Sequence, residues 1–325
     1  MMEWTDRHCR FFHRQLTQHA LLFTEMVTSA AVVHGNRDQL LGYDPVEHPV
    51  AVQLGGSDPH QLAEATKICA DYGYDEINLN VGCPSDRVQS GRFGACLMKE
   101  PELVADCVRA MKDVTDVPIS VKCRIAVDEQ DTEIALDALS DALVEARVDA
   151  LYVHARKAWL KGLSPKENRD IPPLDYPRVY RLAKRLTPLP VMINGGIETL
   201  EQCHTHLKKT SGVMLGRAAY KNPMILAQVD QSIFGKTNKI KTLSDISDVM
   251  TRYAELECSR GTRLNQITRH MLGLANRMPR ARQFRQILSV EACVKGAGPE
   301  VIERAFSVLP APLLTGQEIM SVEIA

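Results

Sequence analysis

The sequence lacks several features that would assign it to a specialised class of protein. Its nine cysteines are an odd number without a Cys-x-x-Cys pair, which argues against a disulfide framework and a zinc ribbon. We find no signal-peptide pattern and no apolar run long enough to span a bilayer. The net charge is −1, so any basic surface for nucleic acid must be local. We therefore expect a monomer of the reducing cytoplasm with no membrane partner and no metal site.

A Gly-x-Gly-x-x-Gly turn between a strand and a helix is also absent, so we expect no Rossmann unit for a dinucleotide. The 325 residues are 45% hydrophobic and 24% charged, which is ordinary for a globular protein. That length accommodates a barrel of about 250 residues together with a small second domain.

Short apolar strands alternate with helical patterns over most of the chain. Apolar strands that alternate with helices predict a parallel sheet. The predicted fold class is α/β, a (β/α)8 TIM barrel whose first strand is largely missing, because a helix already begins at Thr5 or Asp6. An open doubly wound sheet is the alternative. Seven strands are expected, near residues 21–27, 50–56, 76–81, 118–125, 150–156, 190–196 and 212–217.

The pattern changes near residue 242, where helical periodicity continues without strands. We therefore predict two domains, a barrel domain over residues 1–235 and a helical domain over 242–325. The segment 235–241 is the predicted linker.

Residues 76–84 (EINLNVGCP) contain an unusual strand. Its apolar residues point to one side, whereas Asn78 and Asn80 point to the other, and the strand ends at Gly82, Cys83 and Pro84. Buried amides are costly unless they meet partners or a ligand. Alone, this stretch is equally consistent with a catalytic site and with a buried Asn pair beside a small apolar cysteine.

Other strands also end in polar residues, and in a barrel these ends surround one mouth, where active sites lie. Lys122 is notable because a lysine inside an apolar strand requires an anionic partner. We interpret the convergence as a site. Its members at the strand ends are Gln53, Asn80, Cys83, Lys122, Arg124, His154, Arg156 and Asn194.

Two glycine turns follow the last two strands, Asn194-Gly195-Gly196 and Gly216-Arg217. In such barrels these loops bind a phosphate through backbone N–H groups. Flavin mononucleotide (FMN) fits this arrangement, with its ring over the mouth and Lys122 near the pyrimidine end, where reduction builds negative charge.

Taken together, these motifs resemble the tRNA-dihydrouridine synthases. The resemblance covers nearly the whole chain and implies reduction of uridine to 5,6-dihydrouridine in the tRNA D-loop, with NADPH reducing FMN. Further segments resemble the class A bacterial branch, which acts at positions 20 and 20a. The family motifs are residues 78–84 (NLNVGCP), 121–124 (VKCR), 154–156 (HAR), 194–196 (NGG) and 216–217 (GR), and the class A segments are 85–88 (SDRV), 156–160 (RKAWL) and 162–169 (GLSPKENR).

The resemblance also implies roles for individual residues. Cys83 matches the acid that protonates C5 of uracil after a hydride reaches C6 from the flavin, and Asn80 and Arg124 match positions that hold the uracil. The barrel domain would then be the catalytic, FMN-binding one. The implied FMN-binding residues are Met1, Met2, Gln53, Lys122, His154, Asn194, Gly195, Gly196, Gly216 and Arg217.

A base stacked in folded tRNA must be turned out to reach such a site, which requires contacts to the RNA backbone. One basic cluster lies in the loop after residue 156, and another lies in the helical domain, which we therefore interpret as tRNA-binding. The candidate tRNA contacts are Lys157, Lys166 and Arg169 in the loop and Arg282, Gln283, Arg285 and Gln286 in the helical domain.

Two other functions are consistent with parts of the sequence. An FMN barrel oxidoreductase could act on a free pyrimidine, although the basic helical tail argues against it. A tRNA-binding folding helper with weak redox activity is the other, and the missing first strand favours it.

Overall fold

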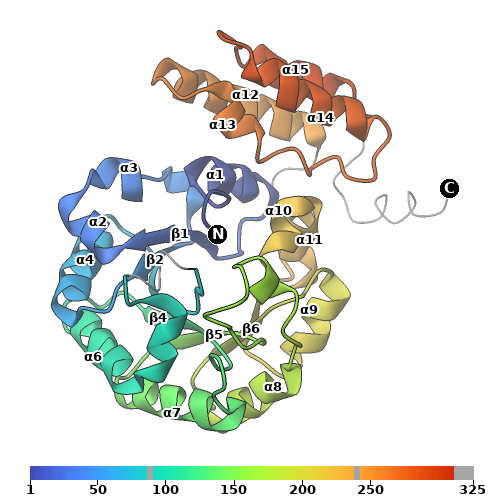
Figure 1. The fold of residues 1–325 in the computed structure, drawn as a ribbon. Helices are drawn as coiled ribbons and strands as arrows, with labels where there is room; N and C mark the ends of the chain where they lie inside the picture. The colour runs from blue at the N-terminus through green and yellow to red at the C-terminus, as the bar shows by residue number, and fades with distance from the viewer. Residues whose placement is uncertain (86–90, 238–241, 311–325) are drawn as a thin grey trace. The chain divides into compact units, whose positions relative to one another are not determined.

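The computed structural model describes residues 1–85, 91–237 and 242–310, and its centre is a single sheet of parallel strands (Figure 1). The strands follow one another in chain order across the sheet, and the registers from β2 to β7 are parallel. The predicted alternation of strands and helices is confirmed. The strands are β1 (Leu22–Thr28), β2 (Val50–Gly55), β3 (Glu76–Val81), β4 (Ile119–Arg124), β5 (Ala150–His154), β6 (Val191–Asn194) and β7 (Gly212–Met214).

The sheet is curled, and helices cover its outer side (Figure 1). All six residues of β2 are buried, as expected for a strand that faces helices on one side and an interior on the other. The helices around it are α2 (Ser29–His34), α3 (Arg37–Leu41), α4 (Pro59–Asp71), α6 (Pro101–Lys112), α7 (Thr132–Glu145), α8 (Tyr176–Arg185) and α9 (Leu200–Leu207), with 3₁₀ turns η1 (Pro45–Glu47), η2 (Gly94–Lys99) and η3 (Glu167–Arg169).

Local sequence signals explain where the helices begin. Asp58 caps α4 by accepting hydrogen bonds from the backbone N–H groups of His60 and Gln61, and Pro59 occupies the first helical position. Asp6 caps α1 (Arg7–Leu16) in the same way, by accepting from the Cys9 N–H at 3.0 Å. The start of α1 agrees with the sequence prediction.

The chain divides into two compact units. Their boundaries differ from a single division of the chain near residue 235. Unit 1 contains residues 1–2, 23–43 and 49–216, and unit 2 contains residues 3–22, 44–48 and 217–325. Helix α1 therefore groups with the helices that follow the sheet. These are α10 (Arg217–Lys221), α11 (Met224–Ser232), α12 (Leu243–Ser259), α13 (Leu264–Thr268), α14 (Ala281–Val290) and α15 (Glu300–Ser307), with the 3₁₀ turn η4 (Glu291–Cys293).

Parts of three predicted segments lie outside the described residues. These are positions 86–88 of the SDRV motif, positions 238–241 of the linker, and positions 311–325 of the helical domain. Among the helices that are described, none has the length and apolar character needed to cross a membrane.

Buried polar contacts hold α1 in unit 2. Arg10 forms an ion pair with Glu47 at 2.6 Å, and both side chains are almost fully buried. At the other end of the helix, the buried carboxylate of Asp230 accepts hydrogen bonds from the Thr17 hydroxyl at 2.5 Å and from the backbone N–H of Gln18 at 2.6 Å. The helix is therefore fixed at both ends.

We predict that Asp230→Ala lowers the free energy of unfolding by about 3–5 kcal/mol, because it leaves buried donors without an acceptor. Urea denaturation measures this change. The matched control is Asp248→Ala on the exposed face of α12, for which we expect a change within about 0.5 kcal/mol. Equal effects of the two substitutions would contradict this account of α1.

Candidate functional site

Pairing of the strands brings the predicted site residues side by side in unit 1. Asn80 of β3 lies opposite Lys122 of β4. Arg124 of β4 lies opposite His154 of β5, which in turn lies opposite Asn194 of β6. These residues lie at or within two positions of the carboxyl ends of their strands, so their side chains gather near the carboxyl edge of the sheet, where ligands bind in parallel α/β folds.

The turn that carries Cys83 is held by the side chain of Asn80. The Asn80 Oδ1 accepts hydrogen bonds from the backbone N–H groups of Gly82 and Cys83, both at 3.0 Å. The Cys83 carbonyl accepts from the Ala95 N–H at 2.9 Å, and the Cys83 Sγ lies 3.5 Å from the Ser85 hydroxyl. The thiol is half-buried, so it is both positioned and accessible.

The side-chain amides of Asn78 and Asn80 on β3 and of Gln53 on β2 all form hydrogen bonds. Asn80 donates through Nδ2 to Gln53 Oε1 at 2.8 Å, and Gln53 donates through Nε2 to Asn78 Oδ1 at 2.9 Å. These contacts remove most of the cost of burying Asn78, which is inaccessible to solvent. These three side chains therefore form a connected row of amides on the inner face of the sheet.

Lys122 is a half-buried cation that forms no ion pair within residues 1–85, 91–237 and 242–310. Its Nζ donates to Asn194 Oδ1 at 3.2 Å, and Asn194 in turn donates to the carbonyl of Met214 at 2.7 Å. Burial, together with the nearby Arg124, lowers the pKa of Lys122 to about 8. A cation held in this way favours an anionic ligand.

His154 is neutral at physiological pH. Burial, the positive charges of Arg124 and Lys122, and other nearby cations hold its pKa well below the usual range. A neutral imidazole can donate one hydrogen bond and accept another, which suits contact with a ligand without adding charge.

The Gly195-Gly196 turn leaves no room for larger residues. Both glycines have positive φ, at +116° and +67°, and a Cβ on Gly195 would lie 2.5 Å from Cδ2 of His154. The Tyr176 hydroxyl fixes the turn by donating to the carbonyl of Gly195 at 2.7 Å. The turn can therefore bring backbone N–H groups close to a ligand.

The chain start contributes to the same region of unit 1. A Cβ on Gly216 would lie 3.6 Å from Sδ of Met1, so the Met1 side chain is beside the second glycine turn. Met2 is 55% exposed. Arg217 follows Gly216 directly along the chain and begins α10 in unit 2.

Arg124 connects the cysteine turn to the loop after β5. Its buried guanidinium donates to the carbonyls of Gly82 at 3.2 Å, Lys157 at 3.1 Å and Asn168 at 2.8 Å. Burial lowers its pKa to about 10, so it remains charged near neutral pH. Contact with uracil, implied by the family resemblance, stays a prediction for this residue.

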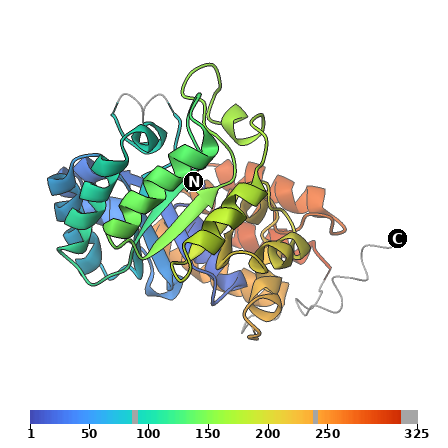
Figure 2. The same ribbon diagram turned by 90° about the horizontal axis from the view of Figure 1, so that it is seen from below.

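The loop between β5 and α8 is built around Asn168. This fully buried side chain accepts from the Trp159 N–H at 2.7 Å and donates to carbonyls including that of Leu163 at 3.1 Å. Lys166 and Arg169 are exposed, and Lys157 lies over the Trp159 ring with its Nζ 5.4 Å from the ring centroid. Figure 2 shows this loop on the same side of the sheet as the segments that flank residues 86–90.

The second predicted basic cluster lies on α14 in unit 2. Phe284, Ile287 and Leu288 are buried in this helix, with Phe284 edge-on to Phe306 at 5.3 Å between ring centroids. The opposite face is exposed and carries the four predicted tRNA contacts, Arg282, Gln283, Arg285 and Gln286.

Three polar residues on the same inner face, Glu76, Ser120 and Tyr152, were not among the predicted site residues. The Ser120 hydroxyl donates to Oε1 of Glu76 at 2.5 Å, and the Tyr152 hydroxyl donates to Oε2 at 3.1 Å. Each lies an even number of residues before a predicted site residue of its own strand, at Asn80, Lys122 and His154 respectively. Extending the polar alternation back along each strand would have identified them.

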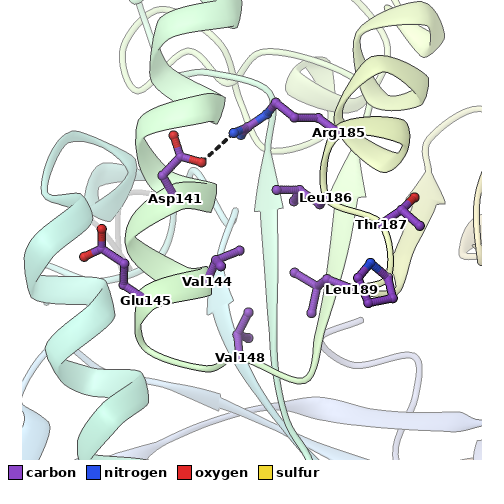
Figure 3. A pocket seen from close by; sticks show the side chains of 9 residues that line it. Asp141, Val144, Glu145, Val148, Arg185, Leu186, Thr187 and Leu189 are labelled. Atoms are coloured by element: carbon purple, nitrogen blue, oxygen red, sulfur yellow. Dashed lines mark hydrogen bonds and ion pairs between the residues drawn. The ribbon is translucent and has the colours of Figure 1, made fainter.

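A surface hollow of about 710 Å³ lies elsewhere in unit 1 (Figure 3). Its walls come from the ends of α7 and α8 and from the segments that lead into β5 and β6, so it is at the amino edge of the sheet. An ion pair between Arg185 and Asp141 at 2.5 Å lies at its rim. It contains none of the predicted site residues, and none of the described residues forms a group suited to hold a metal ion.

Comparisons with known proteins point to one family. Residues 1–307 match the family described as dihydrouridine synthase (Dus). The chain is 54% identical over 314 residues to the tRNA-dihydrouridine(20/20a) synthase of Vibrio parahaemolyticus, covering 96% of each chain. It is 53% identical over 310 residues to the protein of the same name from Escherichia coli (strain K12), covering 95% of this chain and 90% of the relative.

We predict that Gly195→Ala destabilises the protein by about 2–4 kcal/mol, because it adds both backbone strain and a clash with His154. The matched control is Gly162→Ala, which also has positive φ but would meet no atom within 4 Å. We expect the control to lose only about 1 kcal/mol in urea unfolding. Equal losses would mean that crowding at His154 does not restrict the turn.

Proposed function

This chain belongs to the dihydrouridine synthase family, and from that membership we propose that it reduces uridine to 5,6-dihydrouridine in tRNA. Relatives named for positions 20 and 20a support the same two positions as its targets. The observation that carries the proposal is a half-buried cysteine, Cys83, fixed by Asn80 at the edge where Lys122, His154 and Asn194 converge.

We propose FMN as the cofactor and NADPH as the electron donor, and the residues at the strand ends fit a flavin. Lys122 is a half-buried cation that suits the pyrimidine end, and Gly195 and Gly196 form a turn whose backbone could approach a phosphate. When bound, FMN supplies the hydride that adds to C6 of uracil. The other residues that would contact it are Met1, Met2, Gln53, His154, Asn194, Gly216 and Arg217.

Cys83 is the proposed proton donor. Its S–H bond breaks as a new C–H bond forms at C5 of uracil, which leaves a thiolate that regains a proton from solvent. The backbone of the donor is fixed by Asn80 and by the Ala95 N–H, so the sulfur has a defined position before substrate arrives. Such positioning lowers the barrier because less freedom is lost in the transition state.

Asn80 and Arg124 are the proposed uracil contacts. The Oδ1 of Asn80 already accepts two backbone N–H groups, so the side chain offers the base a donor rather than an acceptor. A donor matches a uracil carbonyl, on which negative charge develops as the ring is reduced. The positive charge of Arg124 would likewise stabilise the negative charge on this carbonyl.

We propose that tRNA is held by the basic residues on the β5–α8 loop and on α14. Lys166 and Arg169 are exposed, and the exposed face of α14 combines arginines with glutamines. Under this proposal the region that contains the sheet performs the chemistry, and the helical segment from residue 242 binds RNA. The sheet region would correspond to the eight-stranded barrel expected for the family. The protein would act as a monomer.

We predict that Cys83→Ala lowers dihydrouridine formation by about 100-fold or more, because it removes the acid, whereas NADPH oxidation stays within about twofold. Mass mapping of D-loop uridines and flavin absorbance measure the two activities. Cys96→Ala is the control, since this half-buried thiol lies in η2 and donates to the Phe93 carbonyl. A full product yield from Cys83→Ala would refute the assignment.

We predict that FMN affinity falls about tenfold between pH 7 and pH 9, because Lys122 loses its proton as the pH rises through its pKa of about 8. The charge that attracts the ligand is therefore present below pH 8 and lost above it. Fluorescence titration with FMN measures the affinity. Lys122→Met should bind more weakly at pH 7 and show no such decline, and a flat profile for the native protein would contradict the prediction.

A further inference from the structure

A continuous row of hydrogen bonds runs along the inner face of unit 1, from the amino end of β3 to the cysteine turn. At the turn, the backbone N–H groups of Gly82 and Cys83 donate to Asn80. The row continues as Asn80 Nδ2 to Gln53 Oε1 at 2.8 Å, Gln53 Nε2 to Asn78 Oδ1 at 2.9 Å, Asn78 Nδ2 to Ser120 Oγ at 2.7 Å, and Ser120 Oγ to Glu76 Oε1 at 2.5 Å.

Every donor in the row points the same way, and its two ends enforce that direction. A backbone N–H can only donate, so the Cys83 end requires an acceptor. At the other end Glu76 accepts from the Ser120 hydroxyl; burial raises the pKa of this carboxyl, and the hydrogen bonds from Ser120 and Tyr152 oppose that rise. Three amides and one hydroxyl lie between these ends, and only one set of orientations satisfies all of them.

The orientation matters most at Asn80. If its amide were reversed, the NH₂ group would face two backbone N–H groups and the turn would lose its anchor. The members between Asn80 and Glu76 are buried, with Asn78 and Ser120 fully so, and water cannot replace a lost partner there. An unsatisfied member would therefore disturb its neighbours along the row.

We propose that Glu76 is a positioning residue that fixes the amide of Asn80, and through it the backbone of Cys83, by way of Ser120, Asn78 and Gln53. Glu76 begins β3 and Cys83 follows the end of the same strand, about 20 Å away by strand rise. The proposal rests on the proposed function, because it concerns the acid and the uracil contact of that reaction.

The chain offers a matched pair of variants. Ser120→Ala interrupts the row, whereas Tyr152→Phe removes a hydrogen bond to the other oxygen of the same carboxylate and leaves the row intact. Both substitutions remove one hydroxyl from a buried side chain. General loss of stability should therefore be similar in the two, and only the row distinguishes them.

The first measurement is single-turnover oxidation of the reduced flavin by tRNA, beside reduction of the flavin by NADPH. We expect Ser120→Ala to slow the tRNA step about tenfold, equivalent to about 1.4 kcal/mol, and Tyr152→Phe to change it less than about twofold. NADPH reduction should stay within about twofold in both. Equal slowing by both variants, or equal loss in both half-reactions, would overturn the proposal.

A second pair tests Glu76 itself. Glu76→Leu removes the acceptor and should slow the tRNA step about as much as Ser120→Ala. Glu76→Gln keeps a carbonyl oxygen that can face Ser120, so it should recover much of the lost rate. If Glu76→Gln is as slow as Glu76→Leu, the acceptor at Ser120 is not what positions Asn80.

Amide hydrogen exchange gives a readout that needs no activity. We expect faster exchange at the N–H groups of Gly82 and Cys83 in Ser120→Ala, and native rates in Tyr152→Phe. This result would support the positioning row even if the native protein formed no dihydrouridine, an outcome that would refute the proposed function alone. Unchanged exchange at both groups in Ser120→Ala would refute the row.

Discussion

A half-buried cation without a carboxylate beside it is the constraint on which the site depends. Lys122 lies inside a parallel sheet and finds only the amide oxygen of Asn194 among the described residues. Such a charge is tolerated where an anionic ligand balances it. The neutral state of His154 and the glycine turn at Gly195 are consistent with the same requirement, since one avoids a further cation and the other opens a route for a phosphate.

Polar groups in the interior are arranged so that each meets a complementary partner. The backbone N–H groups at Cys83 and the carboxylate of Glu76 set opposite ends of one row, and the amides between them fit both. This consistency explains how a strand can bury two asparagines and remain stable. It also means that the hydrogen bonds inside the sheet continue to the turn that carries Cys83 at its carboxyl edge.

The strands and their order were predictable because length, apolar character and the turns between them are local signals. The strand-end residues were predictable because parallel strands end at one edge. Ser120 and Tyr152 were not identified as partners of Glu76, because that pairing depends on the register between strands, which no local pattern reveals. Local periodicity likewise could not show that α1 groups with the helices after the sheet, since it does not identify the surface that covers an apolar face.

The loop between β5 and α8 has its own internal framework, because the buried Asn168 satisfies the backbone around it. Many of its bonds to the rest of unit 1 go to β4 and the segment that follows it, where Ala158 pairs with Ala126 and Asp128 and the Leu160 N–H donates to Asp128. A segment of this kind can be exchanged as a module between homologous enzymes if its attachment points are preserved. If the loop contacts tRNA as proposed, such an exchange would change the RNA contacts and leave the residues at the strand ends in place.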